Sequence, residues 1–261
     1  MAVVVGLAST PVKATRLHAV DRLDLGPDGV ADNRRFYVVD AHGRMINSKI
    51  IGELQTIIAD YSAADQRLRL ELPDGRVVED EIRLGDELDT RVFSSERRGR
   101  LVEGPWSEAL SEVAGRPVRL VESCDAGHGV DRGPDGAVSL ISRASLARLA
   151  SAGGIDSPID VRRFRMLVEI DGVGAHEEDG WVGGRPVRIG GAVVAFGGHV
   201  GRCLITSRDP DTGVVDLPTL DILGDYRGAV ATTEPLPFGV WGRVLEPGTV
   251  RLDDEVAPLD G

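Results

Sequence analysis

The sequence predicts a mostly β protein with some helix, an α+β fold. Short runs rich in Val, Leu and Ile alternate along the 261-residue chain with turns rich in Gly, Asp and Pro, as expected for strands joined by tight turns. The 33 glycines and 14 prolines supply those turns. Hydrophobic residues make up 42% of the chain but aromatic residues only 4%, so we expect a core of mainly aliphatic side chains.

Strands and hairpins dominate the first part of the chain. Residues 67–72 alternate strictly and meet a Pro-Asp-Gly turn before 77–78, which predicts a hairpin. A second hairpin is predicted at 34–47, where a short polar turn separates two apolar runs. The other elements predicted here are strands at 2–8, 54–61 and 118–121, a solvated basic loop at 97–100, a helix at 107–113 and a loop at 124–137, and residues 17–25 have alternating character before a turn.

The second part of the chain mixes helix and strand signals. Leu140, Leu146 and Leu149 share one helical face, and two glycines follow, so a helix is predicted at 139–150. Further predicted elements are strands at 166–170, 187–189, 192–196, 204–207 and 238–245, and a short helix at 219–226. We place a domain boundary within 96–135, which gives a first domain at 1–100 and a second at 101–261.

Charge and segment composition exclude several classes of function. The net charge of −12 argues against a nucleic-acid partner, because such binding needs a basic face. No apolar stretch approaches the length of a membrane helix, and the opening Val run is too short for a signal peptide. We therefore expect a cytoplasmic protein that uses neither membrane nor nucleic acid. Its two cysteines, Cys124 and Cys203, are then expected to be thiols.

The stretch 198–213 is the strongest candidate site. A predicted strand runs into a glycine-rich turn that delivers Arg202 and Cys203 side by side, and the turn sequence Asp-Pro-Asp-Thr-Gly follows. Glycines let the backbone approach a ligand closely. An adjacent arginine favours the thiolate and can also hold an anion. The alternative is a buried structural cysteine beside a surface arginine.

This stretch resembles the centre of the MOSC domain, found in molybdenum cofactor sulfurases and in the mitochondrial amidoxime-reducing component. Cys203 stands where that family has its protein ligand to molybdenum, so the resemblance implies Cys203 as metal ligand and catalytic residue. Arg202 and Thr206 also match. The implied cofactor is the molybdenum cofactor, molybdopterin. The implied architecture is an N-terminal β-barrel-like region followed by a MOSC β-barrel with peripheral helices.

Three further segments carry the resemblance and imply contacts to the cofactor. Lys13 follows Pro-Val near the N-terminus and matches a lysine that contacts the pterin phosphate. Arg35 matches an arginine that opens a strand, with Arg34 replacing an aspartate before it. Arg163 and Arg165 flank a phenylalanine as in the family. We expect these basic groups to hold the cofactor, with Lys13, Arg35, Arg163 and Arg165 converging on one pocket.

Three positions depart from the family pattern. Ala14, Leu167 and Gly201 stand where relatives have polar residues that touch the cofactor. We expect weaker cofactor retention as a result, and we expect Ala14→Ser and Leu167→Asn to raise cofactor occupancy. Cys124 matches no family position and should be dispensable.

The resemblance implies an oxidoreductase that reduces N-hydroxylated or N-oxide substrates with electrons from a separate electron-transfer protein. One alternative is a carrier that binds the cofactor, or a sulfur on Cys203, and hands it on. Another is a metal-free thiol enzyme that uses Cys203 with His199. Residues 176–179 are interpreted as a solvated loop rather than a metal site, and no zinc spacing or dinucleotide fingerprint is present. Pyridoxal phosphate binding is not expected.

Overall fold

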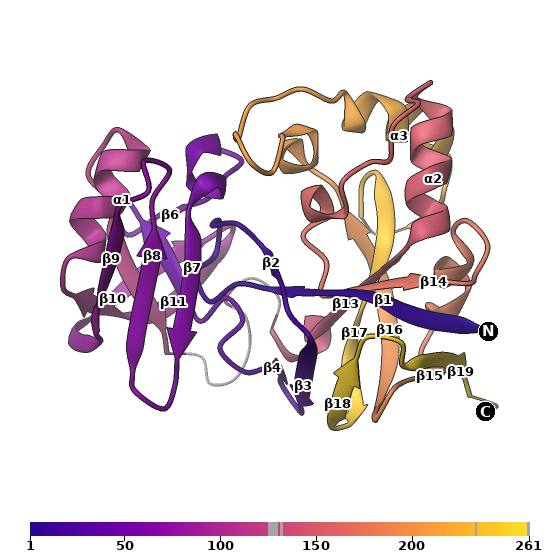
Figure 1. Cartoon of the computed structure of the whole chain (residues 1–261), viewed down its shortest axis with the longest axis horizontal. Coiled ribbons are helices and arrows are strands. Elements are labelled where there is room, and N and C mark those ends of the chain that lie inside the picture. Colours follow the sequence, from indigo (N-terminus) through magenta and orange to yellow (C-terminus); the bar gives the residue numbers. More distant parts are fainter. Residues whose placement is uncertain (125–129, 131–132, 233, 260–261) are drawn as a thin grey trace.

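The computed structural model describes residues 1–124, 130, 133–232 and 234–259. Its strands form two lobes that lie side by side (Figure 1). Among the described residues there are three α-helices, α1 (Trp106–Ala114), α2 (Arg143–Ala152) and α3 (Thr219–Arg227). The mostly β class is therefore confirmed. None of these helices has the length and apolarity that crossing a bilayer requires.

A closed barrel forms the second lobe. The first strand of the chain, β1 (Ala2–Ser9), pairs with β14 on one side and with β19 on the other, and this double pairing closes the sheet on itself. Its aliphatic core contains fully buried Val194 and Val240. The remaining barrel strands, in spatial order from β1, are β14 (Val168–Asp171), β13 (Val138–Ser142), β17 (Pro237–Glu246), β16 (Ala192–Gly201), β15 (Pro186–Ile189) and β19 (Glu255–Pro258).

Helices α2 and α3 cover the outside of this barrel (Figure 1). Ser142 caps α2, because its hydroxyl accepts a hydrogen bond from the Ser145 amide at 3.1 Å. Buried leucines of both helices, Leu149 and Leu223, pack in one cluster with Phe164 and Phe238. That cluster lies beside the end of β16 and so supports the segment that carries Cys203.

The first lobe is built from two smaller sheets around a separate core. Helix α1 packs in that core, where fully buried Trp106 donates from Nε1 to the Leu68 carbonyl at 3.0 Å. One sheet contains β10 (Arg83–Val92), β11 (Ser95–Glu103), β12 (Arg119–Ser123), β5 (Phe36–Val39) and β6 (Met45–Ile46). The other contains β7 (Ile58–Ser62), β8 (Arg67–Glu71) and β9 (Val77–Glu81).

A third small sheet links the two ends of the chain. It consists of β18 (Gly248–Arg251), β3 (Arg22–Gly26) and β4 (Gly29–Val30), while β2 (His18–Ala19) pairs with the end of β1. The register places Val250 opposite Leu23, and both side chains are buried in the barrel core. The early part of the chain thus helps to complete the late barrel.

Several predicted elements are wrong in type or extent. Residues 139–142, predicted as the start of a helix, belong to β13, and both faces of this strand are buried. The basic run 97–100 lies in β11, where Arg98 pairs with Glu87 at 2.6 Å on the neighbouring strand. Residues 204–207 form a 3₁₀ helix, η5 (Leu204–Ser207), and 54–56 fall in η1 (Gly52–Thr56) instead of a strand. Most of the loop predicted at 124–137 lies outside the described residues.

Candidate functional site

A cavity of about 450 Å³ lies between the two lobes. It is lined by segments that are far apart in the sequence, from the loop after β1 to the end of β16. Most of the sequence-predicted site residues gather here. The lining residues are Lys13, Ala14, Arg34, Asn47, Ser48, Lys49, Phe93, Phe164, Arg165, His199, Val200, Gly201, Arg202, Cys203, Ile205, Thr206, Glu234 and Trp241.

Cys203 is exposed at this cavity, at the junction between β16 and η5. Its backbone is extended, and its carbonyl accepts hydrogen bonds from the amide and the hydroxyl of Thr206, each at 3.1 Å. Because Thr206 is almost fully buried, it holds the turn rigidly. The structure therefore excludes the alternative of a buried structural cysteine.

Arg202 has a different role from the one its position beside the thiol suggests. Its Nε donates to the Phe238 carbonyl and its Nη1 to the Phe164 carbonyl, both at 2.8 Å. Nη2 donates to the Phe238 carbonyl and to the Met166 sulfur. The guanidinium is buried and lies over the Phe164 ring, 5.2 Å from its centroid. Arg202 thus ties β16 to β17 and to residues 164–166, and it positions Cys203.

Besides Arg202, the cationic residues among the described residues that line the same cavity are Lys13, Arg34, Lys49 and Arg165. Arg34 donates from Nη2 to the carbonyl of Arg165 at 2.9 Å, and Arg165 donates from Nη2 to the Thr15 carbonyl at 2.7 Å. Both arginines have left-handed backbone conformations, with φ of 55° and 56°. Such values are uncommon for non-glycine residues and are often retained at functional sites. An anion in the cavity would be attracted by these charges.

Arg35 and Arg163 lie outside the cavity, so the predicted convergence of four basic residues is wrong for these two. Arg35 binds Glu122 at 2.5 Å and Asp32 at 2.8 Å, and it stacks on Tyr61. Arg163 makes a bidentate pair with Asp216 at 2.7 and 2.8 Å. Each guanidinium binds carboxylates of the same chain. The spacing of the motifs did not reveal these pairs.

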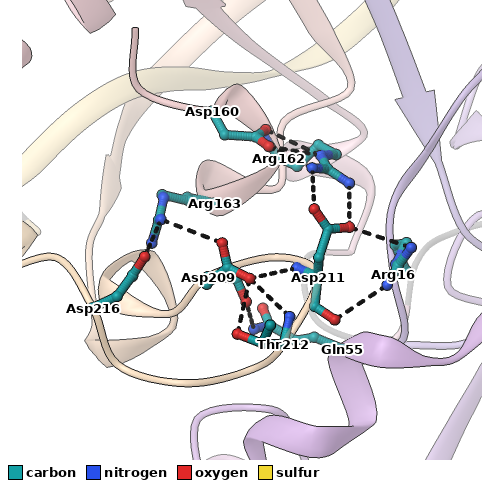
Figure 2. A network of polar contacts seen from close by, with 9 residues as sticks. All are labelled: Arg16, Gln55, Asp160, Arg162, Arg163, Asp209, Asp211, Thr212 and Asp216. Atoms are coloured by element: carbon teal, nitrogen blue, oxygen red, sulfur yellow. Dashed lines mark hydrogen bonds and ion pairs between the residues drawn. The ribbon is translucent and has the colours of Figure 1, made fainter. Parts of the chain in front are cut away.

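The Asp-Pro-Asp-Thr-Gly turn is structural (Figure 2). Asp209 accepts hydrogen bonds from the amide of Asp211 at 3.1 Å and from the amide and hydroxyl of Thr212 at 2.8 and 2.9 Å. Asp211 in turn makes two hydrogen bonds with Arg162, at 2.9 and 2.8 Å, and these lower the pKa of the Asp211 carboxyl. Its second partner, Arg16, lies 3.3 Å away on the loop between β1 and β2. The motif therefore joins distant parts of the chain.

The three departures from the family pattern fall in two environments. Ala14 and Gly201 line the cavity, as predicted from the motifs. A side chain at Gly201 would meet the carboxylate of Glu234, whose Oε2 lies 2.7 Å from the Cβ position. Glu234 lines the cavity too, and no sequence signal marked it. Leu167 instead belongs to the barrel core and is 4% exposed, so it does not line the cavity, which argues against the cofactor contact expected from Leu167→Asn.

His199 lines the cavity, but its ring is paired with Asp179 and not with the thiol of Cys203. Nε2 lies 3.5 Å from Oδ1 of Asp179, and Asp179 also accepts from Nη2 of Arg227 at 2.7 Å. Trp241 donates from Nε1 to the His199 carbonyl at 2.8 Å. Among the described residues, the charged partner of His199 is thus Asp179. This arrangement does not favour a thiol enzyme in which His199 activates Cys203.

Residues 176–179 are not the solvated loop that the sequence suggested. Glu178 is fully buried, and its carboxylate accepts from Ser142 at 3.0 Å and from Ser145 at 2.7 Å. Burial raises the pKa of Glu178, and it lowers the pKa of nearby His176 to about 4. Within the described part of the chain, no three His, Cys, Asp or Glu side chains gather as a metal-binding group.

Comparisons with known proteins agree with this architecture. The family model of the MOSC N-terminal beta barrel domain matches residues 1–113, and that of the MOSC domain matches residues 127–257. The Xenopus laevis mitochondrial amidoxime-reducing component 1 is 26% identical over 94% of this chain and 79% of its own length. Component 2 of Bos taurus is 26% identical over 94% of this chain and 80% of its own. Component 1 of Mus musculus is 34% identical over 45% of this chain and 35% of its own.

Two solved structures are also similar, at low identity. The YUAD protein of Bacillus subtilis aligns over 98% of this chain and 94% of its own, with 12% identity and a TM-score of 0.45. YiiM of Geobacillus stearothermophilus aligns over 49% of this chain and 56% of its own, with 19% identity and a TM-score of 0.36. The assignment rests on the two family models, which together span almost the whole chain: the protein belongs to the MOSC domain family and carries a MOSC N-terminal beta barrel domain ahead of its MOSC domain.

Proposed function

We propose that this protein is a molybdenum-cofactor-dependent oxidoreductase that reduces N-hydroxylated or N-oxide substrates with electrons from a separate protein. The observation that carries the proposal is the exposed thiol of Cys203, which shares one cavity with several cationic side chains, among them Lys13, Arg34 and Arg165. Relatives named for amidoxime reduction support the same kind of reaction.

The cavity fits the chemistry of that cofactor. Molybdopterin brings two dithiolene sulfurs and a phosphate, so it asks the protein for one soft ligand and several cations. Cys203 is the soft ligand, and a thiolate suits a metal with sulfur ligands. Lys13, Arg34 and Arg165 are the cations for the phosphate. When bound, the cofactor supplies the two-electron removal of oxygen from the substrate.

The other lining residues orient and enclose the reactants. Thr206 and Arg202 fix the backbone on both sides of the thiol, so the position of the sulfur does not depend on a mobile loop. Trp241 and Phe164 form apolar walls. Glu234 and His199 also line the cavity, and they are polar groups that could contact a substrate or exchange protons with it.

A carrier that releases the cofactor is the second candidate. Ala14 and Gly201 line the cavity without offering a hydroxyl group, and weaker retention would suit transfer to another protein. Each missing neutral hydrogen bond lowers the binding free energy by about 0.5–1.5 kcal/mol. Turnover with retained metal distinguishes the enzyme from the carrier.

Replacement of the two cysteines tests the proposal. Cys203→Ser should reduce a model amidoxime, driven by an artificial electron donor, at background rate, because a mostly protonated hydroxyl replaces a soft thiolate. Cys124→Ser is the matched control and should keep near-parental activity. Burial and the nearby Glu87 raise the pKa of the Cys124 thiol, which opposes its ionisation. Parental activity in Cys203→Ser would show that molybdenum is not held by this residue.

A further inference from the structure

A second groove, of about 380 Å³, opens beside the cavity. It lies between the β5–β6 hairpin and the tip of the β10–β11 hairpin, which are joined by the bridge between Arg44 and Arg91. Asn47, Lys49 and Phe93 line both hollows, so the groove continues to the mouth of the cavity. Its lining residues are Arg44, Met45, Asn47, Lys49, Ile50, Arg91 and Phe93.

The groove presents large apolar side chains to solvent. Phe93 is 62% exposed and Ile50 is 55% exposed. Phe93 also has a positive φ of 56°, an unfavourable conformation for an aromatic residue at the tip of a hairpin. Strain of this kind persists at binding sites, where the position of the side chain matters more than local stability. An exposed aromatic anchor is typical of the centre of a protein interface.

The rim of the groove is basic in an acidic protein. Arg44, Lys49 and Arg91 are all exposed, and within the described chain none of them has a carboxylate at ion-pair distance. Acidic neighbours offset part of this charge: Asp40, which accepts the backbone amides of His42 and Arg44, interacts with the charge of Arg44, and Glu96 faces Arg91 across the hairpin. Because the whole chain carries a net charge of −12, this basic face is where the protein would steer an acidic partner.

We propose that this groove is the docking surface for an acidic electron-transfer protein, whose redox group comes to rest at the mouth of the Cys203 cavity. The inference rests on the proposed function. Each N-hydroxylated substrate takes up two electrons and two protons and releases water, and a one-electron carrier supplies the electrons in two successive dockings, each of which oxidises one carrier molecule by one electron. Phe93 and Ile50 form the apolar centre of the contact, and the three basic residues set its orientation.

Binding is measured first, because it does not depend on catalysis. The probe is a plant-type [2Fe–2S] ferredoxin, an acidic electron carrier. Basic cytochrome c, an electron carrier of opposite charge, is the comparison. We expect the full-length protein to bind the ferredoxin, more weakly as ionic strength rises above roughly 0.1 M. Arg44→Glu with Arg91→Glu should weaken binding about tenfold or more. Ile50→Ser should weaken it without changing its salt dependence.

The matched control carries the same charge change on the other lobe. Arg188→Glu with Arg243→Glu alters exposed residues of β15 and β17 and should bind as the parent does. Equal weakening in both double variants, or preference for cytochrome c, would overturn the docking surface. Activity with a small artificial donor should survive Arg44→Glu with Arg91→Glu, which shows that the variant is folded, while ferredoxin-driven activity falls. If ferredoxin binds at this groove but no variant or parent is active, the proposed reaction fails and the docking surface stands.

Discussion

Arg202 and Cys203 are neighbours in the sequence, yet their side chains lie in different environments. The guanidinium is buried and binds the carbonyls of Phe164 and Phe238, whereas the thiol is exposed at the cavity. A buried cation is tolerated only when its donors are satisfied, and these carbonyls satisfy them. Arg202 therefore stabilises the end of β16, and Cys203 is presented by a fixed backbone.

Leu167 gives the sharpest disagreement between the family pattern and the structure. Because it is 4% exposed in the barrel core, Leu167→Asn would bury an amide and remove apolar contacts. We expect it to lower the free energy of unfolding by about 3–5 kcal/mol, measured by urea titration.

Leu252→Asn is the control for that substitution. Leu252 is 42% exposed, so its replacement should change stability by no more than about 0.5 kcal/mol. If Leu167→Asn is as stable as Leu252→Asn and also gains cofactor, then position 167 faces the cavity and our placement of it is wrong.

The sequence predicted part of the site at this scale. Lys13, Arg34, Arg165, Arg202, Cys203 and Thr206 were all expected near the cofactor, and all line one cavity. Their roles in binding stay predictions. Arg35 and Arg163 were misplaced because their partners, Glu122 and Asp216, lie far away in the sequence. A single sequence does not show which of several arginines will meet a carboxylate of the same chain.

At the scale of elements, the glycine-rich stretch after Phe196 is a strand rather than a turn. β16 continues to Gly201, with irregular register against β17. Side chains at Gly197 and Gly198 would lie 2.8 and 2.7 Å from the indole of Trp241. The glycines therefore serve the packing of Trp241 against the strand, and the expected close approach of a ligand is not needed to explain them.

Gly213, the last residue of the Asp-Pro-Asp-Thr-Gly turn, is constrained twice. Its φ is +74°, and a Cβ would lie 2.3 Å from the carbonyl oxygen of Gly52. Gly213→Ala should therefore lower the free energy of unfolding by about 3 kcal/mol, the upper end for a strained residue. Thermal or urea unfolding measures the change.

Gly75→Ala separates the two contributions. Gly75 also has a positive φ, of +83°, but no atom lies within 4 Å of its Cβ position. Gly75→Ala should therefore lower the free energy of unfolding through backbone strain alone, by about 1–2 kcal/mol. Equal losses in the two variants would mean that Gly52 and Gly213 are not in tight contact.

Element types were predictable where the pattern was local. The hairpins at 34–47 and 67–78 and the helix at 107–113 have clear turn or amphipathic signals, and the structure contains them. Residues 139–142 were wrongly predicted as helix because a strand buried on both faces has the same apolar content as a buried helix segment. η5 was misread because its geometry depends on the hydrogen bonds of Thr206.

At the scale of the whole molecule, the two lobes are interwoven. β1 belongs to the barrel of the second lobe, while α1 and β12 lie beyond residue 100 and pack in the first. The division into domains at residues 100 and 101 stays a prediction. Polar contacts also join the lobes, since Gln55 donates to the carbonyl of Asp209 at 3.4 Å (Figure 2). The cavity between the lobes depends on these connections.

The ion pairs of Asp211 with Arg162 and Arg16, which join distant parts of the chain, are sensitive to pH. Arg162 lowers the pKa of the Asp211 carboxyl in the folded protein below its ordinary value of 3.8. The ionised carboxylate therefore stabilises the fold at pH values above 3.8, and this contribution is lost as the pH falls through the lower folded-state pKa. Asp211→Asn should cost up to about 1 kcal/mol at neutral pH, since the pair is partly exposed. The difference from the parent should shrink below pH 3.8.

Urea unfolding at a series of pH values measures that difference. Asp156→Asn is the control, because Asp156 is exposed and its side chain makes no hydrogen bond or ion pair with the other described residues. It should follow the parent at every pH. A constant difference between Asp211→Asn and the parent from pH 7 to acid would show that ionisation of Asp211 does not stabilise the fold.

The central claim is that the cavity between the lobes holds molybdenum through Cys203. Elemental analysis of protein purified from a host that makes the cofactor tests it most directly. We predict that the parent protein and Cys124→Ser each bind molybdenum in proportion to the amount of protein, and that Cys203→Ser binds little or none. Parent protein without molybdenum, or Cys203→Ser with as much metal as the parent, would contradict the assignment.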